Sequence, residues 1–126
     1  MSRRIGLKTE PSILGLELDL LKQFSDGTLT ADGTEQTVVE LTRLGHLEGY
    51  IDLSNMQAGD TLVIKVYVKI KSGGSYRQYD SGSYSGVQTS PALHVSALPA
   101  SYGVKVTLQQ SAGINRDYDY KFYRRE

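Results

Sequence analysis

Residues 61–71 alternate strictly between apolar and polar side chains, and this pattern constrains the fold more than any other feature of the chain. The apolar members are Leu62, Ile64, Val66, Val68 and Ile70. Successive side chains of a β-strand point to opposite faces, so a period of two predicts a strand with one buried face. A glycine-containing turn at residues 72–75 and a tyrosine-rich stretch at residues 76–84 follow it, which predicts an antiparallel hairpin.

Shorter alternating segments on both sides of this hairpin predict further strands. They lie at residues 37–44, 47–53, 92–98, 104–109 and 116–124. Turn-forming glycine, proline and aspartate residues separate them, and none of them has a convincing helical period. The chain has no cysteine, so packing and sheet hydrogen bonds must hold the fold without disulfides. The sequence therefore predicts an all-β protein, a two-layer antiparallel β-sandwich that is jelly-roll-like.

The first third of the chain is harder to assign. Residues 13–24 fit a strand, in which alternate leucines share a face, and also a helix, in which Ile13, Leu16, Leu20 and Phe24 share one. Residues 25–34 are rich in Asp, Gly and Thr and predict a linker or a pair of turns. We expect residues 1–31 to form an N-terminal arm and linker, and residues 32–126 to form the sandwich. The alternative is that the segment belongs to the same domain as a strand or a helix.

The charge balance points to no particular partner. Fourteen basic and 14 acidic side chains give a formal net charge of zero, so no overall field attracts nucleic acid or an anionic membrane. No run approaches the roughly 18 apolar residues that would span a bilayer. Gly15, Glu17 and Asp19 interrupt the N-terminal apolar stretch, and no signal-peptide cleavage pattern follows it. We expect a protein made in a host cytoplasm that binds neither nucleic acid nor membrane.

Few residues have the spacing of a catalytic or metal site. Neither His46 nor His94 has a typical metal-binding partner nearby, although Glu48 lies two residues after His46. Asp117 and Asp119 share a strand face and could bind Ca²⁺ or serve as an acid and base pair, but the solvated face of a strand is the simpler account. The sequence predicts no enzyme, no metal and no cofactor. A small hydrolase that depends on one of the histidines is a third-ranked alternative.

The tyrosines of the predicted hairpin are the best candidates for ligand contacts. Tyr76, Tyr79 and Tyr84 lie in its Gly/Ser/Tyr-rich half and could stack on bases or sugar rings. The neutral net charge argues against nucleic acid, and the absence of tryptophan argues weakly against sugar. Cross-strand packing or a subunit interface is favoured for these side chains, because tyrosine combines rigid area with a polar tip.

Four segments carry a resemblance to a known type of domain. They are residues 32–37 (DGTEQT), 48–61 (EGYIDLSNMQAGDT), 66–76 and 102–110 (YGVKVTLQQ). They resemble a domain of uncharacterised proteins from tailed phages and from archaeal or metagenomic viruses, and the likeness covers residues 32–125. In those proteins the domain is similar to a C-terminal module behind stalk-like segments. The resemblance implies a virion surface or tail component, and it provides no functional residues.

These observations together predict a virion structural protein. We expect a capsid decoration or stabilising subunit that forms a homo-oligomer, such as a trimer, and docks on the viral coat protein. The docking element would be the apolar part of the arm, Ile13, Leu14, Leu16, Leu18, Leu20, Leu21 and Phe24. The alternative is a carbohydrate-binding β-sandwich of a tail or surface, which would recognise its receptor through Tyr76, Tyr79 and Tyr84.

Overall fold

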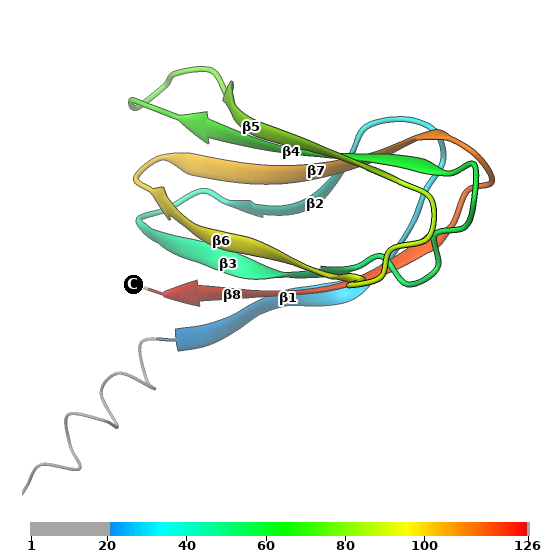
Figure 1. Ribbon diagram of the computed structural model, residues 1–126. Helices are drawn as coiled ribbons and strands as arrows, with labels where there is room; N and C mark the ends of the chain where they lie inside the picture. The colour runs from blue at the N-terminus through cyan, green and yellow to red at the C-terminus, as the bar shows by residue number, and fades with distance from the viewer. Residues whose placement is uncertain (1–20, 126) are drawn as a thin grey trace, which may run out of the picture.

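Two four-stranded antiparallel sheets pack face to face in the computed structural model, which describes residues 21–125 (Figure 1). The strands of this part of the chain are β1 (Leu21–Thr30), β2 (Gln36–Leu41), β3 (Gly45–Asp52), β4 (Thr61–Lys69), β5 (Arg77–Ser85), β6 (Ala92–Ala100), β7 (Gly103–Ala112) and β8 (Asp117–Arg125). All seven strands predicted after residue 34 are present, with ends shifted by a few residues. Residues 21–125 include no helix of the length and hydrophobicity that a membrane crossing requires.

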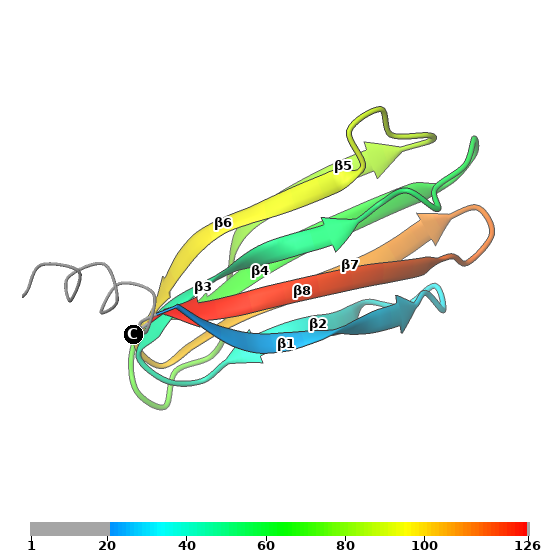
Figure 2. The same ribbon diagram turned by 90° about the horizontal axis from the view of Figure 1, so that it is seen from below.

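The strand order is that of a jelly roll. One sheet has the order β1-β8-β3-β6 and the other β2-β7-β4-β5. The pairs β1–β8, β2–β7, β3–β6 and β4–β5 are all antiparallel, so the two halves of the chain run alongside each other and wrap into a sandwich. Seen from below, β5 and β6 lie along one side and β1 and β2 along the other (Figure 2). The prediction of a jelly-roll-like sandwich is confirmed.

The core lies between the sheets and follows the predicted alternation in its central strands. The largest fully buried side chains are Tyr118, Phe122, Leu41, Leu47, Ile51, Leu53, Met56, Leu62, Leu108, Val104 and Val106. Gly49 of β3 has no room for a side chain, because a Cβ there would overlap the backbone of Phe122 in β8. The apolar alternation of residues 61–71 continues to Ile70 in the sequence, but the buried face of the strand does not. Ile70 was expected to face the core, but β4 ends at Lys69 and Ile70 is 76 % exposed in the following turn.

The N-terminal part of the described chain differs from the expectation. Residues 25–34 were expected to form a linker or turns, but residues up to Thr30 belong to β1, an edge strand paired with β8. Gly27 allows the Tyr120 ring to lie close, since a Cβ at Gly27 would be 3.2 Å from the Tyr120 hydroxyl. Leu29 and Phe24 also pack against the core. The sandwich therefore includes residues assigned to the arm, while residues 1–20 lie outside the described residues.

Candidate binding groove

The β5–β6 side of the sandwich contains a groove of about 250 Å³. Within residues 21–125, β5 pairs only with β4 and β6 only with β3, so both strands have a free edge on this side. The floor consists of apolar side chains from β4 and β6, namely Ile64, Val66, Leu93, Val95 and Leu98. The rim consists of Tyr79, Asp80, Ser81 and Tyr84 from β5 and of His94 and Ser96 from β6.

The sequence of β5 explains why the sandwich is open here. Its register places Tyr84, Gly82 and Asp80 opposite Leu62, Ile64 and Val66 of β4. Gly82 has no side chain, and Asp80 carries a carboxylate where a closed core would have an apolar group. Ile64 and Val66 therefore keep 5 % and 8 % of their surface exposed, whereas Leu62 beside Tyr84 is at 0 %. The Tyr84 ring lies along the strand, with its hydroxyl 2.9 Å from where a Cβ of Gly82 would be.

Tyr79 borders the groove at a β-bulge of β5. Asp80 pairs with Val66 and Gln78 with Tyr67, which leaves Tyr79 as the extra residue. Bulges of this kind redirect a side chain relative to the regular alternation. Tyr79 borders both the main groove and an adjoining hollow of about 140 Å³, and it is 66 % exposed. The two hollows share Val66, Tyr79 and Leu98, so they adjoin one another.

Polar groups of both strands lie at the rim. Asp80 Oδ1 accepts a hydrogen bond of 2.8 Å from the amide of Ser81. On the β6 side, the His94 ring lies 5.0 Å from that of Tyr50, and its Nε2 is 3.4 Å from Glu48 Oε2. The His94 ring is thus engaged with β3, while the carboxylate of Asp80 and the hydroxyls of Ser81 and Ser96 border the apolar floor. This arrangement suits an extended ligand with alternating apolar and polar groups.

The structure brings together two of the three predicted ligand-binding tyrosines. Tyr79 and Tyr84 line the groove, but Tyr76 lies elsewhere, beside Glu40 of β2, Lys69 of β4 and Lys105 of β7. Its hydroxyl donates to Glu40, and the ammonium groups of Lys69 and Lys105 lie 4.8 and 4.7 Å from its ring centre. Burial and the hydrogen bond to Glu40 raise the pKa of Tyr76. Tyr76 is therefore already engaged in contacts within its own sheet.

The predicted arm residues are only partly within the described chain. Ile13, Leu14, Leu16, Leu18 and Leu20 lie outside it. Leu21 is the first residue of β1. Phe24 sits at a bulge of β1 and packs against the core of its own subunit. Its contacts are therefore those of a sandwich residue.

Sequence reasoning missed Asp80 and His94 as groove residues. Their sequence neighbourhoods are unremarkable, and only the pairing of β5 with β4 and of β6 with β3 brings both residues to the same hollow. One local signal was available: the apolar alternation of the hairpin stops at Asp80 and Gly82. In a strand of a two-layer sandwich, that interruption indicates a poorly covered stretch of core.

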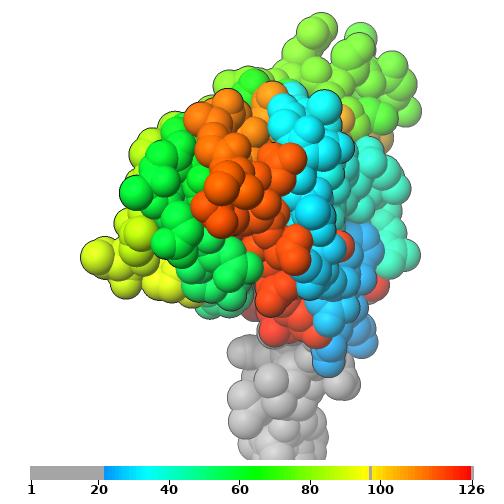
Figure 3. Space-filling model, turned by 90° about the vertical axis from the view of Figure 1, so that its right-hand side faces the viewer, coloured from blue at the N-terminus to red at the C-terminus, as the bar shows by residue number. Residues whose placement is uncertain are grey.

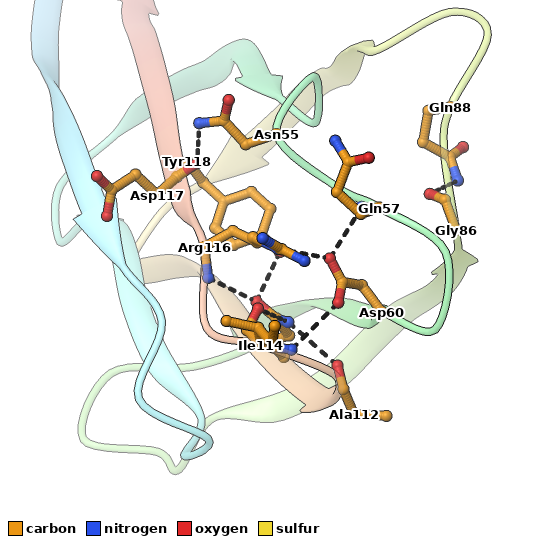
Figure 4. A network of polar contacts seen from close by, with 11 residues as sticks. Asn55, Gln57, Asp60, Gly86, Gln88, Ala112, Ile114, Arg116, Asp117 and Tyr118 are labelled. Carbon is orange, nitrogen blue, oxygen red and sulfur yellow. Dashed lines mark hydrogen bonds and ion pairs between the residues drawn. The ribbon is translucent and has the colours of Figure 1, made fainter.

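A cluster of polar side chains lies at the end of the sandwich where β7 turns into β8 (Figure 4). Asp60 Oδ2 accepts hydrogen bonds from Arg116 Nε at 2.8 Å and from the Gln57 amide at 2.9 Å. Asp60 Oδ1 accepts a further one from the Ile114 amide at 3.2 Å. Gln110 Oε1 accepts from the Tyr118 hydroxyl at 2.9 Å. The cluster joins the β3–β4 and β7–β8 connections, which lie side by side at this end (Figure 3).

The contacts of this cluster are internal, so it functions as a structural element. The hydrogen bond from Arg116 is the main cause of the lowered pKa of Asp60, and the amide of Gln57 adds to it. Burial raises the pKa of Tyr118 to about 12, with the charge of Asp60 as a smaller cause. Gln110 Nε2 donates to the carbonyls of Ala112 and Ile114, which holds the turn after β7.

The residues weighed as catalytic or metal-binding are spread over the surface. Asp117 and Asp119 are exposed and accept hydrogen bonds from the hydroxyls of Thr30 and Thr28, at 2.7 and 2.6 Å, across the β1–β8 pair. Glu48 contacts His94 and not the neighbouring His46. Within residues 21–125, no three His, Cys, Asp or Glu side chains are arranged to hold a metal ion.

Comparison with known proteins provides no relative. No family model matches the chain, and no curated protein or solved structure matches it significantly. The resemblance to virion-associated domains therefore stays a prediction.

Proposed function

We propose that this chain is a virion structural protein, a capsid decoration or stabilising subunit that oligomerises and docks on viral coat protein. The β5–β6 groove is the observation that carries the proposal. There, core side chains of β4 and β6 reach the surface with a small part of their area exposed, and two free strand edges border them. Jelly rolls occur in viral capsid domains and in lectins, which agrees with this use of the fold.

The groove has the composition of a protein interface. Interfaces combine an apolar centre with a polar rim and are enriched in tyrosine. The floor from Ile64 to Leu98 provides the apolar centre, and Tyr79 and Asp80 belong to the rim. Free strand edges can also accept an additional strand through main-chain hydrogen bonds. A binding partner would therefore find both kinds of contact in one place.

Light scattering coupled to size exclusion chromatography of the full chain tests the proposal. We expect a discrete homo-oligomer, which Tyr79→Asp converts to a folded monomer because the charge enters the apolar groove. Tyr102→Asp is the matched control, because Tyr102 is also exposed but lies outside the groove. A chain that stays monomeric at all concentrations would contradict self-assembly. Antibody labelling of purified particles tests the virion location.

A carbohydrate-binding function is the second candidate, because the fold brings Tyr79 and Tyr84 into one groove with Asp80. Sugars stack their apolar faces on aromatic rings, and their hydroxyls donate hydrogen bonds to carboxylates. A glycan array probed with the full chain tests it. Specific binding that is lost in Tyr79→Ala and kept in Tyr102→Ala would support this function. Absence of binding to any glycan, or equal binding by both variants, would reject it.

A further inference from the structure

We propose that the β5–β6 groove receives residues 13–20 of a second copy of this chain, added as a strand beside β6. The inference rests on the proposed function, since it names the partner that the groove binds during self-assembly. Three features carry it: the inner face of β6, the side-chain pattern of residues 13–20, and the position at which β1 begins.

The two edges of the groove differ in what they offer to an added strand. The inner side of β6 has Leu93, Val95 and Leu98, of which Val95 and Leu98 retain 8 % and 6 % of their exposure. Neighbouring apolar side chains on one face are the main stabilising contacts within a sheet. The inner side of β5 instead carries Gly82 and Asp80, and an inward carboxylate on an edge strand opposes strand addition. The free edge of β6 is therefore the better acceptor.

Residues 13–20 have the side chains that this edge requires. Leu14, Leu16, Leu18 and Leu20 alternate with Gly15, Glu17 and Asp19. An extended segment with this pattern presents four leucines to one side and its two carboxylates to the other. The leucines match the apolar floor, and the carboxylates would lie on the same side as His94. Eight extended residues span roughly 27 Å, close to the roughly 30 Å of the nine-residue β6.

The position of β1 favours the groove of a neighbouring subunit. β1 and β6 are the opposite edges of one sheet, so Leu21 is three strand spacings, roughly 14 Å, away from the groove side. β1 begins at the end of the sandwich where β8 finishes, and it runs away from that end (Figures 1 and 2). Entry into the same subunit's groove would need a reversal of direction and a crossing of the sandwich end. Entry into another copy needs neither.

Disulfide trapping tests the inference, because the natural chain has no cysteine and each introduced thiol is unique. One full-length chain carries Leu16→Cys, and a second, enlarged by a tag, carries Tyr79→Cys. The two are mixed, oxidised mildly and separated on a non-reducing gel. The matched control replaces Tyr79→Cys with Ser83→Cys, which is also exposed on β5 but does not line the groove. We expect several-fold more mixed disulfide with Tyr79→Cys than with Ser83→Cys.

Equal yields from the two pairs would overturn the inference. A chain carrying both Leu16→Cys and Tyr79→Cys that forms only an internal disulfide would also overturn it, because the groove would then hold its own segment. Maleimide labelling without oxidation gives a second readout. In the oligomer, Tyr79→Cys should react several-fold more slowly than Ser83→Cys, and equal rates would mean that the groove is open.

Light scattering on the same samples separates this inference from the proposed function. An oligomer without the groove disulfide rejects the inference alone and leaves assembly through another surface, whereas a monomer rejects both. Circular dichroism of each cysteine variant confirms that it retains the strand content of the natural chain.

Discussion

Asp60 is only 1 % exposed, and the hydrogen bonds from Arg116, Gln57 and Ile114 all favour its charged form. Its pKa in the folded protein is therefore lower than the ordinary value of 3.8. A group with a lowered folded pKa contributes stability above its unfolded pKa, and this contribution is lost as the pH falls through the folded pKa. The carboxylate thus links the end of the sandwich to acid stability.

We expect the free energy of unfolding to fall as the pH drops below about 4, and Asp60→Asn to weaken this dependence. The variant should be less stable at neutral pH, because an amide replaces the charged acceptor of Arg116, and nearer to the natural chain at low pH. Urea unfolding at a series of pH values measures both. Glu35, whose pKa the hydroxyls of Thr107 and Tyr67 lower, retains part of the slope in the variant. Parallel pH profiles for the two proteins would refute the assignment to Asp60.

Gly113 has a φ of +91°, a backbone conformation that residues with a Cβ rarely adopt. A Cβ at this position would also overlap Asp60 Oδ1. Gly113→Ala should therefore lower the free energy of unfolding by on the order of 1–3 kcal/mol. Gly73→Ala is the matched control, because Gly73 has a similar φ of +73° but open space around it. Chemical denaturation of both variants separates the backbone cost from the disturbance of the Asp60 cluster, and equal losses would show that the overlap has no cost.

At the level of the strands, β1 decides where the domain begins. Deleting residues 1–20 should leave a folded sandwich, since the described strands lie beyond them. Deleting residues 1–30 also removes β1, its pairing with β8 and the packing of Phe24 and Leu29, and it exposes the edge of β8. We expect this longer deletion to unfold or aggregate. Circular dichroism and thermal unfolding of the two truncations test this, and a stable fold without β1 would make that strand dispensable.

The strands that the sequence predicted correctly are those whose alternation reflects local burial. β4 is the clearest, because its inward residues are apolar and its outward residues are polar. β1 was missed because Asp26, Gly27 and Thr28 have the composition of a turn, and only the distant β8 makes them a strand. For the same reason, the sequence indicated only some of the residues that line the groove. Tyr79 and Tyr84 stood out in the sequence, but the bulge that redirects Tyr79 and the approach of β6 depend on long-range pairing.

The molecule as a whole offers two surfaces of opposite character for assembly. The groove has an apolar floor, whereas the outer face of the β2-β7-β4-β5 sheet is charged. There the hydroxyls of Tyr67 and Thr107 donate to Glu35, and Lys105 lies over the rings of Tyr67 and Tyr76. These charged groups already contact one another within the subunit. Assembly through this face would depend on salt, but assembly through the groove would not.

Raising NaCl from about 0.1 M to about 1 M shortens the Debye length from roughly 10 to 3 Å and so weakens contacts between exposed charges. Burial of apolar surface does not weaken under the same change, and the chain has a net charge of zero. We expect the oligomer to keep its mass in sedimentation velocity across this range, and Lys105→Gln to assemble like the natural chain. Val95→Asp, which places a charge in the groove floor, should instead yield smaller species at both salt concentrations, with its fold checked by circular dichroism. Dissociation at high salt, together with a defect in Lys105→Gln, would move the interface from the groove to the charged face of the sheet.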